Sequence, residues 1–292
     1  MTACQTGSLN RINDRSSSKG IRRSYVDGRF GQMHVFAVGP TQIKSRKLAK
    51  TPLVCFHPTP MSSDYYRDYM LAMATDRLVI AIDTPGYGFS DRPPEPQTME
   101  QYALAMADAL DALGFGAAGM GAVDMMGYHT GVFIATELAI LRPDLVRRLV
   151  LPGIPYTAPE DMTETYAAYA KPEPLTETGK GMQKAWAFSI TEREPGVPLE
   201  RAFDHFKDHV RALPYAWWAY HGVFSYPGAE RLPMVTMPVL VPVSHGGLET
   251  ETRTAGHLFP NATLIEMPEL HHGIFDIKVP ELVEVSRAFL DR

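Results

Sequence analysis

The chain has 292 residues, a formal net charge of −5 at pH 7 and a sequence pI near 6.1. With 45% hydrophobic residues it can bury one large core, alone or with an inserted lid, and two large independent domains are a tight fit. This charge excludes the strongly cationic surface that draws proteins to nucleic acids or anionic membranes, so we expect neither as a partner.

The two cysteines favour a reducing, cytoplasmic location. Cys4 lies in a polar segment and Cys55 in an apolar run, which argues against a structural disulfide. The N-terminal segment is rich in Ser, Asn and basic residues, lacks the apolar stretch of a signal peptide, and is predicted to be a disordered tail over residues 1–20. No later run is long enough to cross a bilayer.

The first predicted element is a β-hairpin. Two short alternating runs, 24–26 and 33–38, flank the turn-forming Asp27, Gly28 and Gly31. A basic loop at 44–50 follows, and after it apolar strand-like runs alternate with helical segments. These predicted strands are 53–56, 78–82, 123–126, 149–151, 239–241 and 263–265, with a closing amphipathic helix at 280–290. Continuous apolar strands that alternate with helices indicate a mostly parallel sheet covered on both faces.

Residues 156–231 break this alternation and are predicted to form a helical cap inserted into a core of residues 21–155 and 232–292. The segment is helical in composition, rich in Pro and Glu, and holds all three tryptophans. Adjacent residues on a helix point in different directions, so part of the run WWAYH at 217–221 is expected to line a pocket. Its substrate-binding candidates are Trp217, Trp218 and His221. His205 and His209, four residues apart, are attributed to a solvated helix face.

The segment VDMMGYHTG at 123–131 has the layout of a nucleophile elbow. A strand runs into a sharp turn and then into the helical segment 132–141. The flanking Gly127 and Gly131 allow the cramped backbone that lifts the middle side chain over the edge of the sheet. The residue in that position is His129.

Two upstream segments complete a family resemblance. FHPTP at 56–60 looks like the His-Gly turn after strand 3 of the α/β-hydrolase superfamily, and DTPGYGFSD at 83–91 is similar to the Asp-x-Pro-Gly-x-Gly-x-Ser loop after strand 4. Together with the elbow they resemble the haloalkane dehalogenase, epoxide hydrolase and proline iminopeptidase branch, from about residue 22 to the end. The resemblance implies an α/β-hydrolase fold: an eight-stranded, mostly parallel sheet with helices on both faces and an inserted helical cap. GYHTG is similar to a subgroup usually labelled only α/β hydrolase, which defines the fold more than the reaction.

The resemblance also implies an oxyanion hole. Pro58 replaces the usual glycine and has no amide hydrogen, but in the family the donor is generally the next residue, here Thr59. The second donor corresponds to the amide of Thr130. His57 and Tyr128, beside these positions, are candidates for substrate contact.

The other two members of the usual triad are matched unequally. Gly247 stands where the family places its aspartate, and Glu249 can replace that acid only if the loop is remodelled. MPELHHG at 267–273 resembles the Gly-His turn before the last helix. By the distance to Pro280, His272 matches the catalytic histidine better than His271.

Four functions stay open. Because His129 excludes a seryl or aspartyl ester, the first is hydrolysis of an activated ester or lactone of a small apolar molecule, with His129 as nucleophile or base and His272 as proton shuttle. The second is a cofactor-free lyase or isomerase that uses both histidines as an acid/base pair. The third is a zinc site of His57, His129 and His272, although no short ligand spacing supports it and no metal or other cofactor is expected. The fourth is an inactive ligand-binding protein. A small-molecule partner is expected, and assembly as a homodimer stays open.

Overall fold

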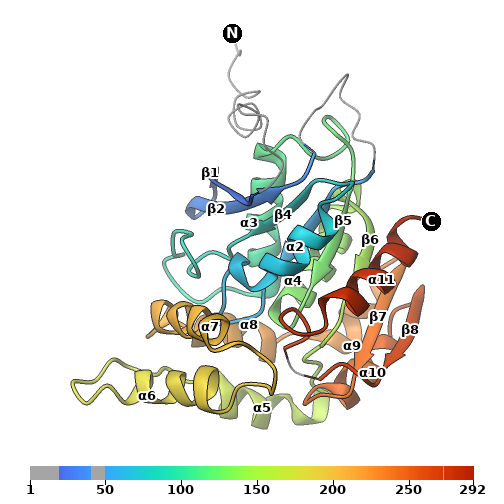
Figure 1. Ribbon diagram of the computed structural model, residues 1–292. Helices are drawn as coiled ribbons and strands as arrows, with labels where there is room; N and C mark the ends of the chain where they lie inside the picture. Colours follow the sequence, from blue (N-terminus) through green and yellow to red (C-terminus); the bar gives the residue numbers. More distant parts are fainter. Residues whose placement is uncertain (1–19, 41–49, 272) are drawn as a thin grey trace.

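The computed structural model describes residues 20–40, 50–271 and 273–292. Its centre is an eight-stranded sheet of order β1-β2-β4-β3-β5-β6-β7-β8 (Figure 1). β2 runs antiparallel to β1 and β4, and the other neighbours are parallel. Apart from Gly20 and Lys50, the predicted tail and basic loop lie outside the described residues.

The strands follow the predicted runs. They are β1 (Arg22–Gly28), β2 (Gly31–Val38), β3 (Leu53–Phe56), β4 (Val79–Ile82), β5 (Val123–Gly127), β6 (Val146–Val150), β7 (Val239–Ser244) and β8 (Ala262–Met267). The opening hairpin, the order of the elements and the mostly parallel sheet are confirmed.

Helices cover both faces of the sheet, which explains why the central strands are apolar throughout. On one face lie α3 (Met99–Ala112), α4 (Thr130–Leu141) and α10 (Glu249–Gly256); on the other lie η2 (Ser63–Tyr66), α2 (Arg67–Met73) and α11 (Val279–Leu290). Side chains of β3 alternate between the two cores, with Val54 and Phe56 in the first and Leu53 and Cys55 in the second. The short helix η3 (Pro143–Leu145) precedes β6.

Between β6 and β7 every regular element is helical. These elements are η4 (Pro159–Asp161), α5 (Met162–Tyr169), α6 (Lys180–Trp186), the π-helical turn η5 (Ala187–Thr191), α7 (Leu199–Ala212), α8 (Trp217–Phe224), α9 (Gly228–Arg231) and η6 (Leu232–Met234). In Figure 1, α5, α6 and α7 lie below the sheet. None of the helices in the described part of the chain combines the length and the apolar character needed to cross a membrane.

Candidate functional site

The turn between β5 and α4 holds His129 in a constrained conformation. Its φ of 52° and ψ of −118° make it the one non-glycine residue with positive φ among those described. A Cβ on Gly131 would lie 1.8 Å from the carbonyl oxygen of Phe56, and one on Gly127 would lie 2.3 Å from the carbonyl oxygen of Gly131. The two glycines therefore permit a strained turn that presents the His129 side chain at the edge of the sheet.

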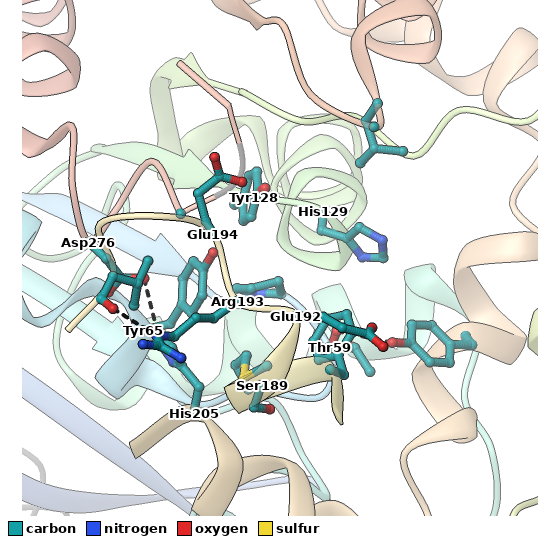
Figure 2. Close-up of a pocket in the computed structure, with 18 of the residues that line it drawn as sticks. Thr59, Tyr65, Tyr128, His129, Ser189, Glu192, Arg193, Glu194, His205 and Asp276 are labelled. Carbon is teal, nitrogen blue, oxygen red and sulfur yellow. Dashed lines mark hydrogen bonds and ion pairs between the residues drawn. The ribbon is translucent and has the colours of Figure 1, made fainter. Parts of the chain in front are cut away.

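His129 borders a cavity of about 570 Å³ between the core and the helices that follow β6 (Figure 2). A second cavity of about 520 Å³ adjoins it. Both are lined by His129, Tyr169, Tyr220, Gly247 and Leu248. The imidazole thus lies where the two cavities meet.

The surroundings of His129 keep its imidazole neutral. Burial lowers its pKa to about 4. Its Nδ1 lies 3.3 Å from Oγ1 of Thr130, and that hydroxyl donates its own hydrogen to Oγ1 of Thr59 at 2.8 Å. Since the Thr130 hydrogen is already used, Thr130 can only accept from Nδ1–H, which leaves Nε2 with a free lone pair.

Thr59 and Thr130 lie side by side next to the imidazole. Besides the bond between their hydroxyls, the carbonyl oxygen of Thr59 accepts from the Tyr220 hydroxyl at 3.2 Å. No acceptor for either backbone amide is found within the described parts of the chain. Two N–H groups next to the elbow are therefore available to a ligand.

His57 does not line either of these cavities, contrary to the prediction that it contacts substrate. It is 1% exposed, its Nδ1 donates to the carbonyl of Pro58 at 2.9 Å, and its Nε2 accepts from the amide of Thr84 at 2.9 Å. Burial also lowers its pKa. His57 braces two loops, and with both ring nitrogens occupied it cannot serve as a ligand in the alternative zinc site. Among residues 20–40, 50–271 and 273–292, no group of three or more His, Cys, Asp or Glu side chains is placed to hold a metal ion.

In the cap run, the residue that reaches the cavity is Tyr220, whereas the predicted Trp217, Trp218 and His221 line neither cavity. Trp218 packs against Trp217 with ring centroids 6.4 Å apart, and the guanidinium of Arg92 lies over its ring at 5.7 Å. His221 Nδ1 is bonded to the hydroxyl of Tyr166 at 2.7 Å. The helical period directs one side of α8 to the cavity, and Tyr220 lies on that side.

Of the remaining predicted site residues that the structure describes, Tyr128 lines the cavity and Glu249 does not. Tyr128 lines the cavity and stacks on Tyr65, with ring centroids 5.8 Å apart. Glu249 lines neither cavity; its carboxylate pairs with Arg253 at 3.0 Å, so the geometry gives it no contact with His129. His272 lies outside the described residues, while the neighbouring Gly273 lines the cavity.

One charged cluster in the cavity wall was not expected from the sequence. His205 of α7 is 9% exposed, and its Nε2 donates to Oδ2 of Asp276 at 3.0 Å. Arg201 Nε donates to the other oxygen of Asp276 at 2.7 Å. The prediction of a solvated face for His205 is therefore wrong. His209, one turn further, is also partly buried, and burial lowers its pKa to about 4.

Comparison with known proteins agrees with this architecture. Residues 51–179 match the family described as alpha/beta hydrolase fold. A 2-hydroxymuconate semialdehyde hydrolase from Pseudomonas sp. strain CF600 is 34% identical over 109 residues, which are 35% of this chain and 36% of that protein. The polyketide synthase ThaQ of Burkholderia thailandensis is 28% identical over 246 residues, 79% of this chain but 11% of ThaQ. The chain thus spans about a third and about a tenth of the lengths of these two relatives.

Among solved structures, the enol-lactonase from Burkholderia xenovorans LB400 superposes with a TM-score of 0.74 at 17% identity, covering 92% of this chain and 100% of the lactonase. A hydrolase from Pseudomonas aeruginosa PA01 superposes with a TM-score of 0.73 at 18% identity, covering 93% of this chain and 99% of that hydrolase. Sheet order, elbow, the family match over residues 51–179 and the superposed structures agree: the chain has the α/β-hydrolase fold.

Proposed function

We propose that this protein hydrolyses an activated ester or lactone bond in a small, largely apolar molecule, without a seryl or aspartyl intermediate. The observation that carries the proposal is the neutral, partly buried imidazole of His129 at the tip of the elbow, between two cavities. Residues 156–231 act as the cap that closes over the substrate.

The proposed reaction uses His129 Nε2 as the nucleophile. Its lone pair attacks the acyl carbon, a C–N bond forms, and the C–O bond to the leaving group breaks. The amides of Thr59 and Thr130 bind the developing oxyanion. The proton on Nδ1 passes to the leaving group, for which His272 is the proposed shuttle. Water then releases the acid from the labile acyl-imidazole and restores the proton to the His129 ring.

The low pKa of His129 favours hydrolysis over the lyase alternative. A base with a pKa of about 4 removes a proton from carbon poorly, because proton transfer slows as the base weakens. The same weakness restricts nucleophilic attack to acyl groups with good leaving groups. Activated esters and strained or enolic lactones meet this requirement, and simple amides do not.

Two relatives support the choice of reaction class. One shares 34% identity over a third of this chain and is a 2-hydroxymuconate semialdehyde hydrolase, and a solved structure with the same fold is an enol-lactonase. Both names describe small oxygenated substrates.

The test is the hydrolysis of 4-nitrophenyl acetate by His129→Ala, with His257→Ala as the matched control because His257 is exposed and lines neither cavity. We expect His129→Ala to lose at least about a hundredfold in kcat and to keep the wild-type melting temperature, while the control stays unchanged. Rapid-quench mass spectrometry should find the acetyl group on His129.

Three outcomes separate the alternatives. Loss of activity without an adduct would assign His129 as the base that activates water. Full activity in His129→Ala would remove the elbow histidine from the reaction and leave the cavity as a binding site. Turnover in H₂¹⁸O without ¹⁸O in the product acid would exclude hydrolysis and favour a lyase.

A further inference from the structure

A second imidazole lines the cavity, apart from the elbow. Figure 2 shows His205, Tyr65 and Asp276 gathered on one side of the cavity and His129 on the other. His205 and Asp276 are 71 residues apart in the chain, and the bond of 3.0 Å between them joins the cap helix α7 to the loop before α11.

Arg201 fixes this pair in place. Its Nε donates to Asp276 at 2.7 Å, and its other nitrogens donate to the carboxylate of Asp64 at 2.8 Å and to the carbonyl oxygens of Asp64 and Tyr65 at 2.7 and 3.0 Å. Both oxygens of the Asp276 carboxylate are thus engaged, one by Arg201 and one by His205. Such a fully bonded carboxylate holds its partner imidazole in one orientation.

The carboxylate also determines which ring nitrogen carries the hydrogen. Burial raises the pKa of Asp276, but the hydrogen bond from His205 and the charge of Arg201 outweigh it and hold the pKa below its ordinary value. An ionised carboxylate can only accept, so Nε2 of His205 carries a hydrogen. In the neutral imidazole Nδ1 then has a free lone pair, and no partner for Nδ1 is present among the described residues.

Aromatic rings line the cavity wall beside this imidazole. The Tyr65 ring lies 5.1 Å from the His205 ring and is stacked on Tyr128 with an interplanar angle of 10°. Tyr169 and Phe188 of the cap line the same cavity. A flat apolar group that carries a hydrogen-bond donor matches this wall.

We propose that His205 and Asp276 form a recognition site for an acidic hydroxyl group, a phenol or an enol, on the substrate. The hydroxyl donates to Nδ1 of His205 while the ring or double bond that bears it packs against Tyr65 and Tyr128. The proposal rests on the proposed function in one respect: the same molecule presents its acyl group to His129. The hydroxyl site itself consists of other residues.

Two substitutions separate recognition from cap anchoring. In His205→Gln the side-chain amide reaches the position of Nε2 and keeps a donor for Asp276, but nothing replaces Nδ1. In His205→Asn the side-chain oxygen replaces Nδ1 as acceptor, but the bond to Asp276 is lost. His209→Gln is the control, since His209 lies one turn further along α7 and lines neither cavity.

The experiment measures calorimetric binding of two ketones that cannot be hydrolysed, 4-hydroxyphenylacetone and phenylacetone. We expect the wild type to bind the hydroxylated ketone about threefold to tenfold more tightly, the range of one neutral hydrogen bond. His205→Gln should abolish this preference and leave the affinity for phenylacetone unchanged, whereas His209→Gln should keep it. His205→Asn should retain part of the preference and lower the melting temperature.

Binding at equilibrium separates this proposal from the hydrolase proposal. His129→Ala should retain the preference even if it abolishes turnover, and a failure of the hydrolase assay leaves the binding measurement valid. The proposal is overturned if His205→Gln leaves the preference unchanged or loses affinity equally for both ketones. It is also overturned if the wild type binds neither ketone or binds both alike. In each case His205 and Asp276 serve only to anchor the cap.

Discussion

Desolvation decides what His129 can do as a single residue. The pKa is lowered from its ordinary value near 6.5 to about 4, and the form that works as nucleophile or base is the deprotonated one. We therefore expect kcat/KM for 4-nitrophenyl acetate to stay level from neutral pH down to about pH 5 and to fall through an apparent pKa of about 4. Circular dichroism at each pH serves as the control for unfolding. A midpoint near 6.5 would instead indicate a solvated imidazole.

Some site residues belong to short sequence motifs, whereas others meet partners that are distant in the sequence. His129, Tyr128 and Thr130 belong to one short motif and Thr59 to another, and the two motifs follow the neighbouring strands β5 and β3. His205 lies in α7 and its partner Asp276 lies 71 residues later in the chain, and the spacing of His205 from His209 is equally typical of a solvated helix. No local pattern could have identified that pair.

The misplaced aromatic residues have a similar cause. The run 217–221 indicates that some side chain enters the cavity, and Tyr220 does. Which side of a short helix faces inward depends on how the cap packs, and α8 presents Trp218 to Arg92 instead. His57 was expected to contact substrate, but its two ring nitrogens bond to the backbone of Pro58 and Thr84. Neither bond can be predicted from the spacing of residues in the sequence.

The start of strand β6 shows how a prediction from apolar runs can misplace the boundary of a strand. β6 begins at Val146, three residues before the predicted start. The prediction began too late because Arg147 and Arg148 interrupt the apolar run. Arg147 donates to the buried carboxylate of Asp124 at 2.7 and 2.8 Å, and Arg148 donates to the carbonyl of Phe289. Charged residues with buried partners can therefore occupy strand positions that composition assigns to a loop.

The elbow is the element whose geometry depends most strictly on one residue. A methyl group at Gly131 would lie 1.8 Å from the Phe56 carbonyl oxygen, so β3 and α4 must move apart in Gly131→Ala. We expect this variant to lose at least about 3 kcal/mol in the free energy of unfolding, measured by urea denaturation, together with all activity.

Gly181→Ala in α6 is the matched control. Its added methyl meets nothing closer than 3.4 Å, and alanine favours a helix over glycine by about 1 kcal/mol, so we expect unchanged or slightly higher stability. Equal stability of the two alanine variants would contradict the close approach of β3 and α4 at the elbow.

For the whole molecule, the mostly parallel sheet follows from the alternation of strands and helices, but the way α7 is fastened to the core does not. Arg201 of α7 joins Asp276 and Asp64, two carboxylates of the core, and only 8% of its side chain is exposed. Composition does not distinguish a buried arginine from an exposed one, and the burial of Arg201 between two segments of the core is seen only in the folded structure.

The last prediction compares Arg201→Met with Arg142→Met. Each arginine binds two carboxylates at 2.7 to 3.0 Å, but the Arg142 side chain is 28% exposed and its partners Asp111 and Asp144 lie at the surface. Removing Arg201 leaves the buried carboxylate of Asp276 without its arginine, while Asp64 keeps its ion pair with Arg67, and we expect a loss of about 3 to 5 kcal/mol in urea denaturation.

The loss in Arg142→Met should stay below about 1 kcal/mol, because water and salt already screen that pair. Limited proteolysis locates the effect: Arg201→Met should be cut first within residues 156–231, since α7 is no longer bound to the core, whereas Arg142→Met should keep the wild-type pattern. If both variants lose equal stability, or if cleavage in Arg201→Met begins in the core, the buried cluster does not fasten the cap.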